Sequence, residues 1–184
     1  EKALTAESPA DVGMAFSGKI KVLHMLEFLC RDECAGEIER NIAMPLRGLK
    51  AVSYYGCLLV RPPQTTKAPS WEDPQNLDRL IARLGGESVY WPYKTECCGG
   101  SLVLSKVDIV RRLCGRLLDM AQEAGAECIV TACPLCQANL DTREEEIGRE
   151  KGISYDIPIF YFTELMGLAF GNKGVHKWFS RHLV

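Results

Sequence analysis

The sequence lacks a long hydrophobic run, an excess of basic charge and any internal repeat. No uninterrupted apolar stretch reaches the roughly 20 residues needed to cross a bilayer, and the first four residues have no signal-peptide pattern. The 22 Lys and Arg residues are mixed with 24 Asp and Glu residues, so there is no broad basic field to attract nucleic acid or an anionic membrane. We therefore expect a cytoplasmic protein with no membrane span and no nucleic-acid partner.

The composition is that of an ordinary globular protein. Hydrophobic residues make up 47% of the 184 residues and charged residues 25%, which argues against long disorder. This length suits one hydrophobic core better than two. Residues 1–18 are rich in Ala, Ser, Gly and Asp without periodicity, so we expect a flexible lead-in followed by a single domain over residues 19–184.

Short β-prone segments alternate with helical patterns along the chain. The apolar spacing predicts strands over 50–56, 88–91, 127–132 and 157–161, and helices over 20–29, 38–44, 74–84, 107–125, 137–146 and 163–170, with a loop over 61–69. Strands that alternate with helices favour a parallel sheet with helices on its faces. The expected fold is α/β: a small parallel-type sheet flanked by helices, with cysteine-bearing loops at the carboxyl ends of the strands.

Five of the nine cysteines lie in three turns that follow predicted strands. An odd number of cysteines cannot all pair within the chain, and clustered thiols in a reducing compartment are more often metal ligands or redox groups. Ligand sites in open α/β sheets lie beyond the carboxyl ends of the strands. The three turns are therefore expected to converge, although the second requires its loop to fold back. They carry Cys57, Cys97 with Cys98, and Cys133 with Cys136.

Two of these turns have local features that favour bound thiolates. Pro134 follows Cys133 at the expected first helical position, where its missing N–H costs nothing. Free amide groups and the positive end of the helix dipole at such a position stabilise thiolates. After Cys98, the pair Gly99 and Gly100 allows a sharp turn and a close approach to a bulky inorganic sulfide.

The number and adjacency of the thiols bear on the metal. Soft thiolates suit iron–sulfur clusters, zinc or copper(I). A structural zinc ion takes four ligands, and the adjacent Cys97 and Cys98 cannot easily place both sulfurs on one tetrahedral ion. A cubane iron–sulfur cluster also takes four cysteines, so a fifth suggests an unusual cluster in which one sulfur bridges two irons. A zinc-stabilised interaction domain, and a thioredoxin-like dithiol at Cys133 and Cys136, are the alternatives.

The other four cysteines have simpler interpretations. Cys114 lies on the apolar stripe of a long helix and Cys128 in a buried strand, so both are expected to pack as small hydrophobic residues. Cys30 and Cys34 are four residues apart, on one face if their helix continues that far. No third or fourth metal ligand accompanies them in the sequence, so we do not expect a second metal site there.

The remaining polar candidates are expected to be structural. His24 is interpreted as a hydrogen-bonding group rather than a catalyst, and His176 and His182 as part of a solvated basic face. Lys94 lies close enough to the second cysteine turn to offset cluster charge, but a surface lysine is the simpler interpretation. The aromatic residues that flank the cysteine turns are expected to pack around the site: Tyr54, Tyr55, Trp91 and Tyr93.

The order of the cysteines resembles a known family. Cys57, then Cys97-Cys98-Gly99, then Cys133-x-x-Cys136 is similar to the cysteine-rich CCG domain found in the B subunit of heterodisulfide reductase. The flanking sequences agree as well, namely Tyr54-Tyr55-Gly56 before the first cysteine and Gln137-Ala138-Asn139-Leu140-Asp141 after the last. The similarity runs from about residue 20 to residue 170, and the single module resembles the carboxyl-terminal one of that B subunit.

The resemblance implies a function and a ligand set. It implies that Cys57, Cys97, Cys98, Cys133 and Cys136 bind a noncubane [4Fe–4S] cluster made of two fused smaller units. It also implies an oxidoreductase subunit that reduces a disulfide, such as that between coenzymes M and B, and that is not active alone. Its partners would be heterodisulfide reductase-like subunits carrying flavin or iron–sulfur clusters.

The resemblance also leaves the substrate open. The heterodisulfide reductase B subunit carries two CCG modules and this chain has one, so the chain is a fragment, a single-module relative, or half of a site that a partner completes. The same domain type occurs in iron–sulfur subunits of glycolate and lactate oxidation systems and in succinate dehydrogenase relatives. We therefore expect transfer of electrons through the cysteine site, with disulfide reduction as one of several possible reactions.

Overall fold

Four short parallel strands form the centre of the structure, a computed structural model that describes residues 19–68 and 70–182. The strand order is β2-β1-β3-β4, and all three pairings are parallel. Ala51 is paired with Cys128 in the register of the two central strands. The expected lead-in lies outside the described residues. The strands are β1 (Lys50–Tyr54), β2 (Glu87–Ser88), β3 (Cys128–Thr131) and β4 (Ile159–Tyr161).

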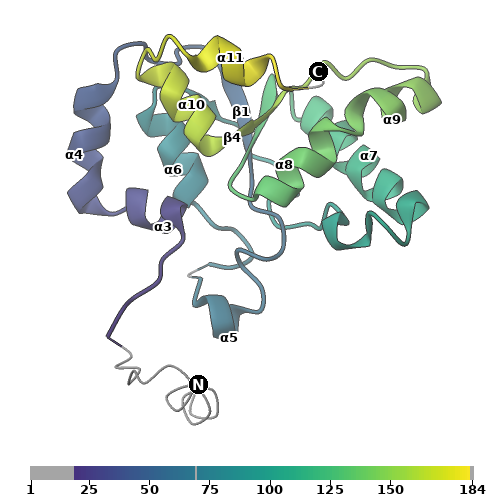
Figure 1. Cartoon of the computed structure of the whole chain (residues 1–184), viewed down its shortest axis with the longest axis horizontal. Helices are drawn as coiled ribbons and strands as arrows, with labels where there is room; N and C mark the ends of the chain where they lie inside the picture. Colours follow the sequence, from purple (N-terminus) through teal and green to yellow (C-terminus); the bar gives the residue numbers. More distant parts are fainter. Residues whose placement is uncertain (1–18, 69, 183–184) are drawn as a thin grey trace, which may run out of the picture.

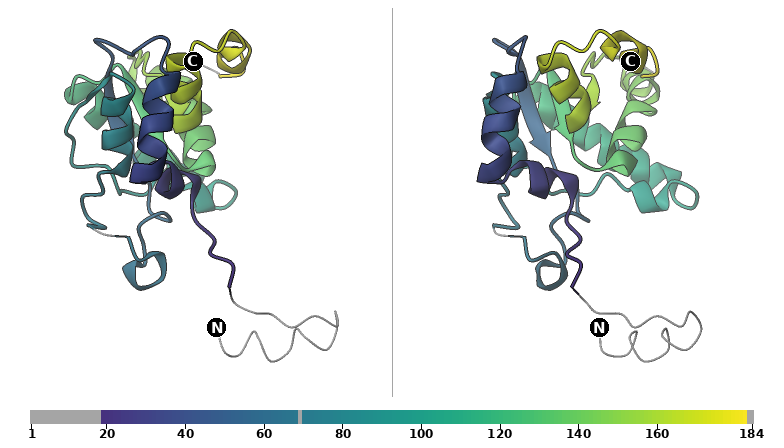
Figure 2. Two further views of the ribbon diagram at one scale, coloured as in Figure 1. Left: turned by 90° about the vertical axis from the view of Figure 1, so that its left-hand side faces the viewer. Right: turned by 60° about the vertical axis from the view of Figure 1, so that its left-hand side comes forward.

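Helices cover both faces of this sheet (Figure 1). One group, α3, α4, α6 and α10, lies on one side, and α7, α8 and α9 lie on the other (Figure 2). None of the helices in the described ranges has both the length and the hydrophobicity that a bilayer span requires. The helices are α3 (Met25–Leu29), α4 (Asp32–Asn41), α5 (Pro63–Thr66), α6 (Asn76–Arg83), α7 (Val107–Glu123), α8 (Pro134–Asp141), α9 (Glu144–Lys151), α10 (Phe162–Ala169) and α11 (Val175–Phe179), with a 3₁₀ turn at Gly100–Leu102.

The two central strands have buried side chains on both faces. Every residue of β3 is buried, as are the last four residues of β1. Ala51 packs into the core beneath α6 and α10, whereas Val52 and Tyr54 pack into the core beneath α7 and α8. Continuous burial of this kind is typical of a parallel sheet covered by helices on both sides. The expected α/β fold is confirmed.

Several boundaries differ from those expected. The first helix of the described residues begins at Met25, because His24 adopts an extended conformation and its Nδ1 accepts the Leu26 N–H at 3.2 Å. His24 is thus a structural hydrogen-bonding group, as expected, but at the helix cap rather than within the helix. The next helix is α4, earlier in the chain than the predicted 38–44, and the predicted loop 61–69 contains the short α5. The helix predicted over 137–146 is divided into α8 and α9.

The carboxyl-terminal residues contain a correction. His176 is exposed, as expected for a solvated face, but the interpretation of His182 was wrong. Its side chain is 8% exposed, with Nδ1 3.1 Å from an oxygen of Asp141 and Nε2 3.2 Å from an oxygen of Glu164. These carboxylates come from α8 and α10, far from His182 in the sequence. The basic residues near the chain end therefore gave no sign of them.

Candidate metal centre

Three adjacent strands bring the cysteine turns to one edge of the sheet. Cys57 follows β1, the vicinal pair follows β2 after a loop, and Cys133 begins the turn after β3. The Sγ atoms of Cys57 and Cys97 are 3.9 Å apart, and those of Cys98 and Cys136 are 3.5 Å apart. The structure therefore brings the cysteines of all three turns together, as the convergence of strand ends predicts.

The first turn depends on a glycine. Gly56 has a φ of +65°, in the left-handed region that favours glycine, and a Cβ built there would lie 2.7 Å from the Cys136 sulfur. Two backbone amides that follow Cys57, those of Val60 and Arg61, donate to its carbonyl oxygen at 3.3 and 2.9 Å. The backbone before Cys57 can approach Cys136 only because no side chain separates them.

The second turn is held by a loop that folds back over β1. The Tyr55 N–H donates to the Lys94 carbonyl at 2.8 Å, and the Tyr54 hydroxyl donates to the Glu96 carbonyl at 2.8 Å. Gly99, with a φ of +79°, then turns the chain so that its N–H donates to the Cys97 sulfur at 3.2 Å. This is the reversal that the convergence of the turns requires.

The third turn is the start of α8. Cys133 occupies the N-cap position, Pro134 is the first helical residue, and the Cys133 N–H donates to the Thr131 hydroxyl at 3.2 Å. A hydrogen bond from the Cys136 thiol and backbone amides of the first helical turn lower the pKa of Cys133 to about 6. The predicted stabilisation of a thiolate at the helix start is thus present.

Cys136 is the thiol that interacts with both other helix-side cysteines of the site, Cys98 and Cys133. Its hydrogen bond to Cys98 is the largest cause that lowers the pKa of Cys98 to about 6, with further help from Asn139 and the Gly100 amide. The pKa of Cys136 itself is raised, because its proton is held by Cys133 and Cys98 and because its side chain is buried. Contact among the three sulfurs therefore lowers the pKa of Cys98 and Cys133 and raises that of Cys136.

The donor set fits a sulfur-ligated cluster. All nine cysteines are free thiols, and the five at this edge present only soft ligands. A Cβ at Gly56 would crowd a cysteine sulfur, whereas a Cβ at Gly100 would make only an ordinary contact of 3.5 Å with the Cys98 sulfur. Among the described residues, no three Cys, His, Asp or Glu side chains are arranged to hold a single metal ion. A cluster is wider than one ion, so its ligands need not converge on a point.

The interpretation of Lys94 as a surface residue was wrong. Its side chain is 4% exposed, and Nζ lies 2.9 Å from an oxygen of Asp73 and 3.0 Å from an oxygen of Asp78. Asp78 also accepts hydrogen bonds from the Tyr55 and Ser88 hydroxyls. This network ties the loop before Cys97 to α6, and its members are too far apart in the sequence for a local pattern to reveal them.

Cys114 and Cys128 pack as small hydrophobic residues, as expected, and Tyr54 and Trp91 lie in the same core as Cys98 and Cys136, whereas Tyr55 lies in the core on the other face. Cys114 and Cys128 are fully buried, and Cys30 donates to the Asn76 carbonyl at 3.2 Å. Trp91 donates to the Ser53 carbonyl at 2.8 Å and meets Tyr54 edge to face, with ring centroids 6.0 Å apart.

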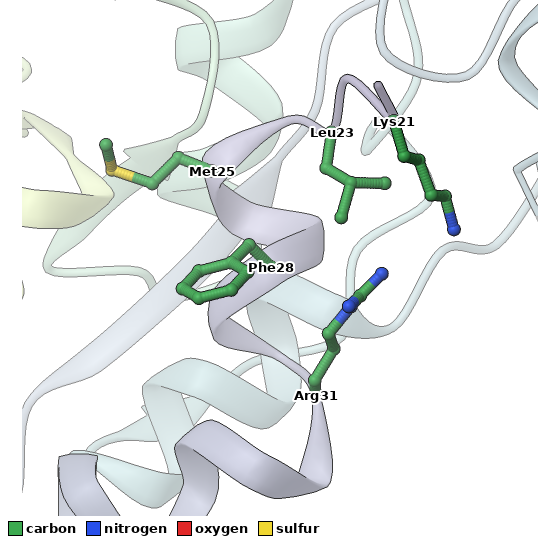
Figure 3. Close-up of a pocket in the computed structure, with 5 residues that line it drawn as sticks. All are labelled: Lys21, Leu23, Met25, Phe28 and Arg31. Carbon is green, nitrogen blue, oxygen red and sulfur yellow. The ribbon is translucent and has the colours of Figure 1, made fainter. Parts of the chain in front are cut away.

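An open pocket of about 530 Å³ lies elsewhere, on the segment that enters α3. Figure 3 shows Lys21 and Arg31 on one side of Phe28, with Met25 pointing the other way. Leu23 completes the lining. None of the five cysteines lines this pocket, so it is separate from the candidate metal centre.

Comparison with known proteins confirms the family resemblance. Residues 51–141 match the family described as a cysteine-rich domain, CCG. The B subunit of the ferredoxin:CoB-CoM heterodisulfide reductase of Methanosarcina mazei is 32% identical over 172 residues, covering 92% of this chain and 57% of that protein. The B subunit of the ferredoxin/F420H2-dependent CoB-CoM heterodisulfide reductase of Methanosarcina acetivorans is 31% identical with the same coverage.

A relative from a different system is also similar. The 8-methylmenaquinol:fumarate reductase membrane anchor subunit of Wolinella succinogenes is 27% identical over 158 residues, covering 86% of this chain and 55% of that protein. The chain thus spans a little over half the length of each of these three relatives. The matched family region includes all three cysteine turns.

Proposed function

Because residues 51–141 belong to the cysteine-rich CCG domain family, we propose that the chain is an iron–sulfur redox subunit, or a domain of one, in a heterodisulfide reductase-like complex. The observation that carries this proposal is the meeting of three cysteine turns at one edge of the sheet, with Sγ separations of 3.9 and 3.5 Å. The proposed ligands are the five cysteines of those turns: Cys57, Cys97, Cys98, Cys133 and Cys136.

The proposed cofactor is a noncubane [4Fe–4S] cluster. Such a cluster, when bound, supplies one-electron transfer and iron that can take a substrate sulfur. The chain's own groups favour the negative charge of the ligands: the Gly99 amide faces Cys97, and the amides at the start of α8 face Cys133. These donors are fixed by the fold and need no rearrangement when charge increases.

The burial of the cysteines gives the site an inner and an outer side. Cys98 and Cys136 are buried, whereas Cys57, Cys97 and Cys133 are partly exposed. A substrate would therefore approach the outer three. For disulfide reduction the balance is R–S–S–R′ plus two electrons and two protons, giving R–SH and R′–SH. We propose that partner subunits carrying flavin or iron–sulfur clusters deliver the electrons.

The extent of the functional unit follows from the coverage of the relatives. Since the chain spans 57% of the Methanosarcina mazei relative, we propose that the remainder, or a partner that supplies a second CCG module, completes the substrate site. The single domain over residues 19–184 and a cytoplasmic location stay predictions.

A second candidate is an iron–sulfur subunit of a succinate or fumarate-type oxidoreductase. The Wolinella relative favours it, because its name places a similar sequence in a fumarate reductase. The zinc-stabilised interaction domain receives less support, because a structural zinc ion needs four ligands around one point and the adjacent Cys97 and Cys98 cannot easily place both sulfurs on one tetrahedral ion.

The test is the metal and sulfide content of the chain purified without oxygen. The proposal predicts iron and acid-labile sulfide in about equal amounts and broad visible absorption, with Cys98→Ser reducing both. Cys128→Ser is the matched control, since Cys128 is equally buried but lies in β3 away from the turns. Stoichiometric zinc without sulfide would overturn the cluster and support the interaction domain instead.

A further inference from the structure

Asn139 is a buried polar side chain beside the candidate metal centre. It lies on α8, just under one turn after Cys136, and is 5% exposed. Its Nδ2 donates to the Cys98 carbonyl at 2.8 Å and lies 3.3 Å from the Cys114 sulfur. One amide group therefore connects the helix of the third cysteine turn to the backbone of the second.

The orientation of this amide is determined by a neighbour. Arg143 Nε donates to the Asn139 Oδ1 at 2.9 Å. A guanidinium group can only donate hydrogen bonds, so the amide oxygen must face Arg143 and the NH₂ group must face Cys98. The side chain of Arg143 is 16% exposed and its other end lies 3.7 Å from Glu146, which holds the guanidinium in place.

A second donor reaches the same carbonyl from a different helix. The Cys114 thiol, on α7, donates to the Cys98 oxygen at 3.4 Å. Cys114 is fully buried, and the Cys98 carbonyl is nearer to its sulfur than the Asn139 carbonyl, which is 4.0 Å away. The Cys98 carbonyl is thus held by α8 and α7 together, and a buried carbonyl that lost these partners would bear a desolvation penalty.

We propose that Asn139 and Cys114 are positioning residues that fix the Cys98 backbone so that its sulfur faces Cys136, and that they thereby set the environment of the bound cluster. The inference rests on the proposed function for the cluster itself. We call these two hydrogen bonds to the Cys98 carbonyl, from Asn139 and Cys114, the clamp. The clamp is a property of the chain alone, so part of the test needs no metal.

The experiment uses Asn139→Leu, which removes the amide donor at similar volume, and a matched pair of substitutions at Cys114. Cys114→Ala removes the donor, whereas Cys114→Ser keeps one. Cys128→Ala controls for the loss of a buried sulfur far from the site. Each chain is measured in two states: reconstituted without oxygen, for the reduction potential and the electron paramagnetic resonance spectrum, and metal-free, for hydrogen exchange of the amides of Gly99 and Gly100.

We expect Asn139→Leu and Cys114→Ala to shift the potential and alter the spectrum, because a Cys98 backbone released from α7 and α8 no longer holds its sulfur in one position. In the metal-free chain, exchange at the two glycines should be about tenfold faster, the factor that corresponds to one lost hydrogen bond. Cys114→Ser should resemble the wild type more than Cys114→Ala does, and Cys128→Ala should leave potential, spectrum and exchange unchanged.

The inference is overturned if Asn139→Leu and Cys114→Ala match Cys128→Ala in potential, spectrum and exchange. A wild-type chain that takes up no cluster would overturn the proposed function instead. Unchanged exchange in the metal-free variants would then also overturn the clamp, and faster exchange would support it as a property of the fold. If Asn139→Leu does not fold, the difference between Cys114→Ala and Cys114→Ser still decides.

Discussion

Gly56 is the residue at which the backbone and the candidate ligands meet most closely. Replacing it with alanine adds a Cβ that would lie 2.7 Å from the Cys136 sulfur, at a φ of +65°. We expect Gly56→Ala to lower the unfolding free energy of the metal-free chain by about 2–3 kcal/mol, from backbone strain and overpacking together. Iron uptake should fall as well, which metal analysis measures.

Gly125→Ala is the control for backbone strain alone. Gly125 has a φ of +73°, but nothing lies within 4 Å of a Cβ built there. The Gly125→Ala substitution should lower the unfolding free energy by about 1 kcal/mol and leave iron uptake unchanged. Equal effects of the two substitutions on uptake would contradict the role given to Gly56.

Lys94 is a buried cation whose removal would leave the carboxylate of Asp78 without its ion-pair partner. In Lys94→Met, Asp78 would lose its ion pair while remaining 13% exposed. We expect a loss of about 3 kcal/mol in unfolding free energy, since removing one partner of a buried pair leaves the other uncompensated. Lys173→Met is the control, because Lys173 is exposed. It should change the unfolding free energy measured with denaturant by less than about 0.5 kcal/mol. A loss no larger than that of the control would mean that the pair does not hold the loop.

Glu144 contributes a dependence of stability on pH. Burial raises its pKa to about 7, and its Oε2 has no hydrogen-bond partner in the described structure, while Oε1 accepts the Ile157 N–H at 2.9 Å. The folded state therefore holds a proton that the unfolded state releases, and stability falls as pH rises from about 4.5 to about 7. Glu144→Gln should flatten the curve of unfolding free energy against pH in that window. A slope equal to that of the wild type would contradict this origin.

The residues that could be predicted from the sequence are those whose chemistry is local. Thiols in turns, a proline at a helix start and adjacent glycines identify the candidate site by type and spacing. Lys94 and His182 could not be assigned, because their partners come from other elements and a charged residue is by default exposed. Asn139 was visible only as part of a similar flank, with nothing local to indicate its contact with Cys98.

At the scale of elements, the carboxyl-terminal segment is fastened to α8 and α10 by a histidine. His182 lies between carboxylates of Asp141 and Glu164, and its ring meets those of Phe160 and Phe179 at 5.8 and 6.2 Å. The other oxygen of Glu164 accepts from Gln137 and from the Tyr161 N–H. The contact thus links three elements, one of which is α8, the helix that directly follows Cys133.

This contact should be stronger at low pH. Hydrogen bonds and charge interactions with Glu164 and Asp141 raise the pKa of His182 despite burial, which opposes them. Its stabilisation is therefore fully present below the unfolded value of about 6.5 and is lost as pH rises through the folded pKa. We expect His182→Gln to cost about 1–2 kcal/mol at pH 6 and less at pH 9.

The measurement is denaturant unfolding at both pH values, followed by proteolysis of the carboxyl-terminal segment. His176→Gln is the control, since His176 is exposed on α11. A cost that is equal at pH 6 and pH 9, or equal to that of the control, would show that the histidine is not acting as a charged clamp.

Periodicity was sufficient for elements that bury a continuous stripe or run of side chains and insufficient for the others. The stripe of α7 and the apolar run of β3 were predicted almost to their ends, because each buries many side chains on one face or on both. The break between α8 and α9 was missed, since Thr142 and Arg143 are compatible with a helix and only tertiary packing ends it there. The two residues of β2 are too few for a strand pattern.

For the whole molecule, the order of the strands explains how turns distant in sequence form one site. With β1 between β2 and β3, the first, second and third cysteine turns become neighbours at one edge. Alternation of strands and helices predicted the parallel sheet, but the order within it is a property of packing that the sequence pattern does not carry. The separate cores on the two faces hold this edge in place from both sides.

The central claim is that five cysteines, and not the other four, hold one iron–sulfur cluster. The most direct measurement is iron bound per chain across all nine single Cys→Ser variants, each reconstituted without oxygen beside the wild type. We predict that substitution of Cys57, Cys97, Cys98, Cys133 or Cys136 reduces bound iron, while substitution of Cys30, Cys34, Cys114 or Cys128 preserves it. Full iron retention in the first group, or its loss in the second, would contradict the account.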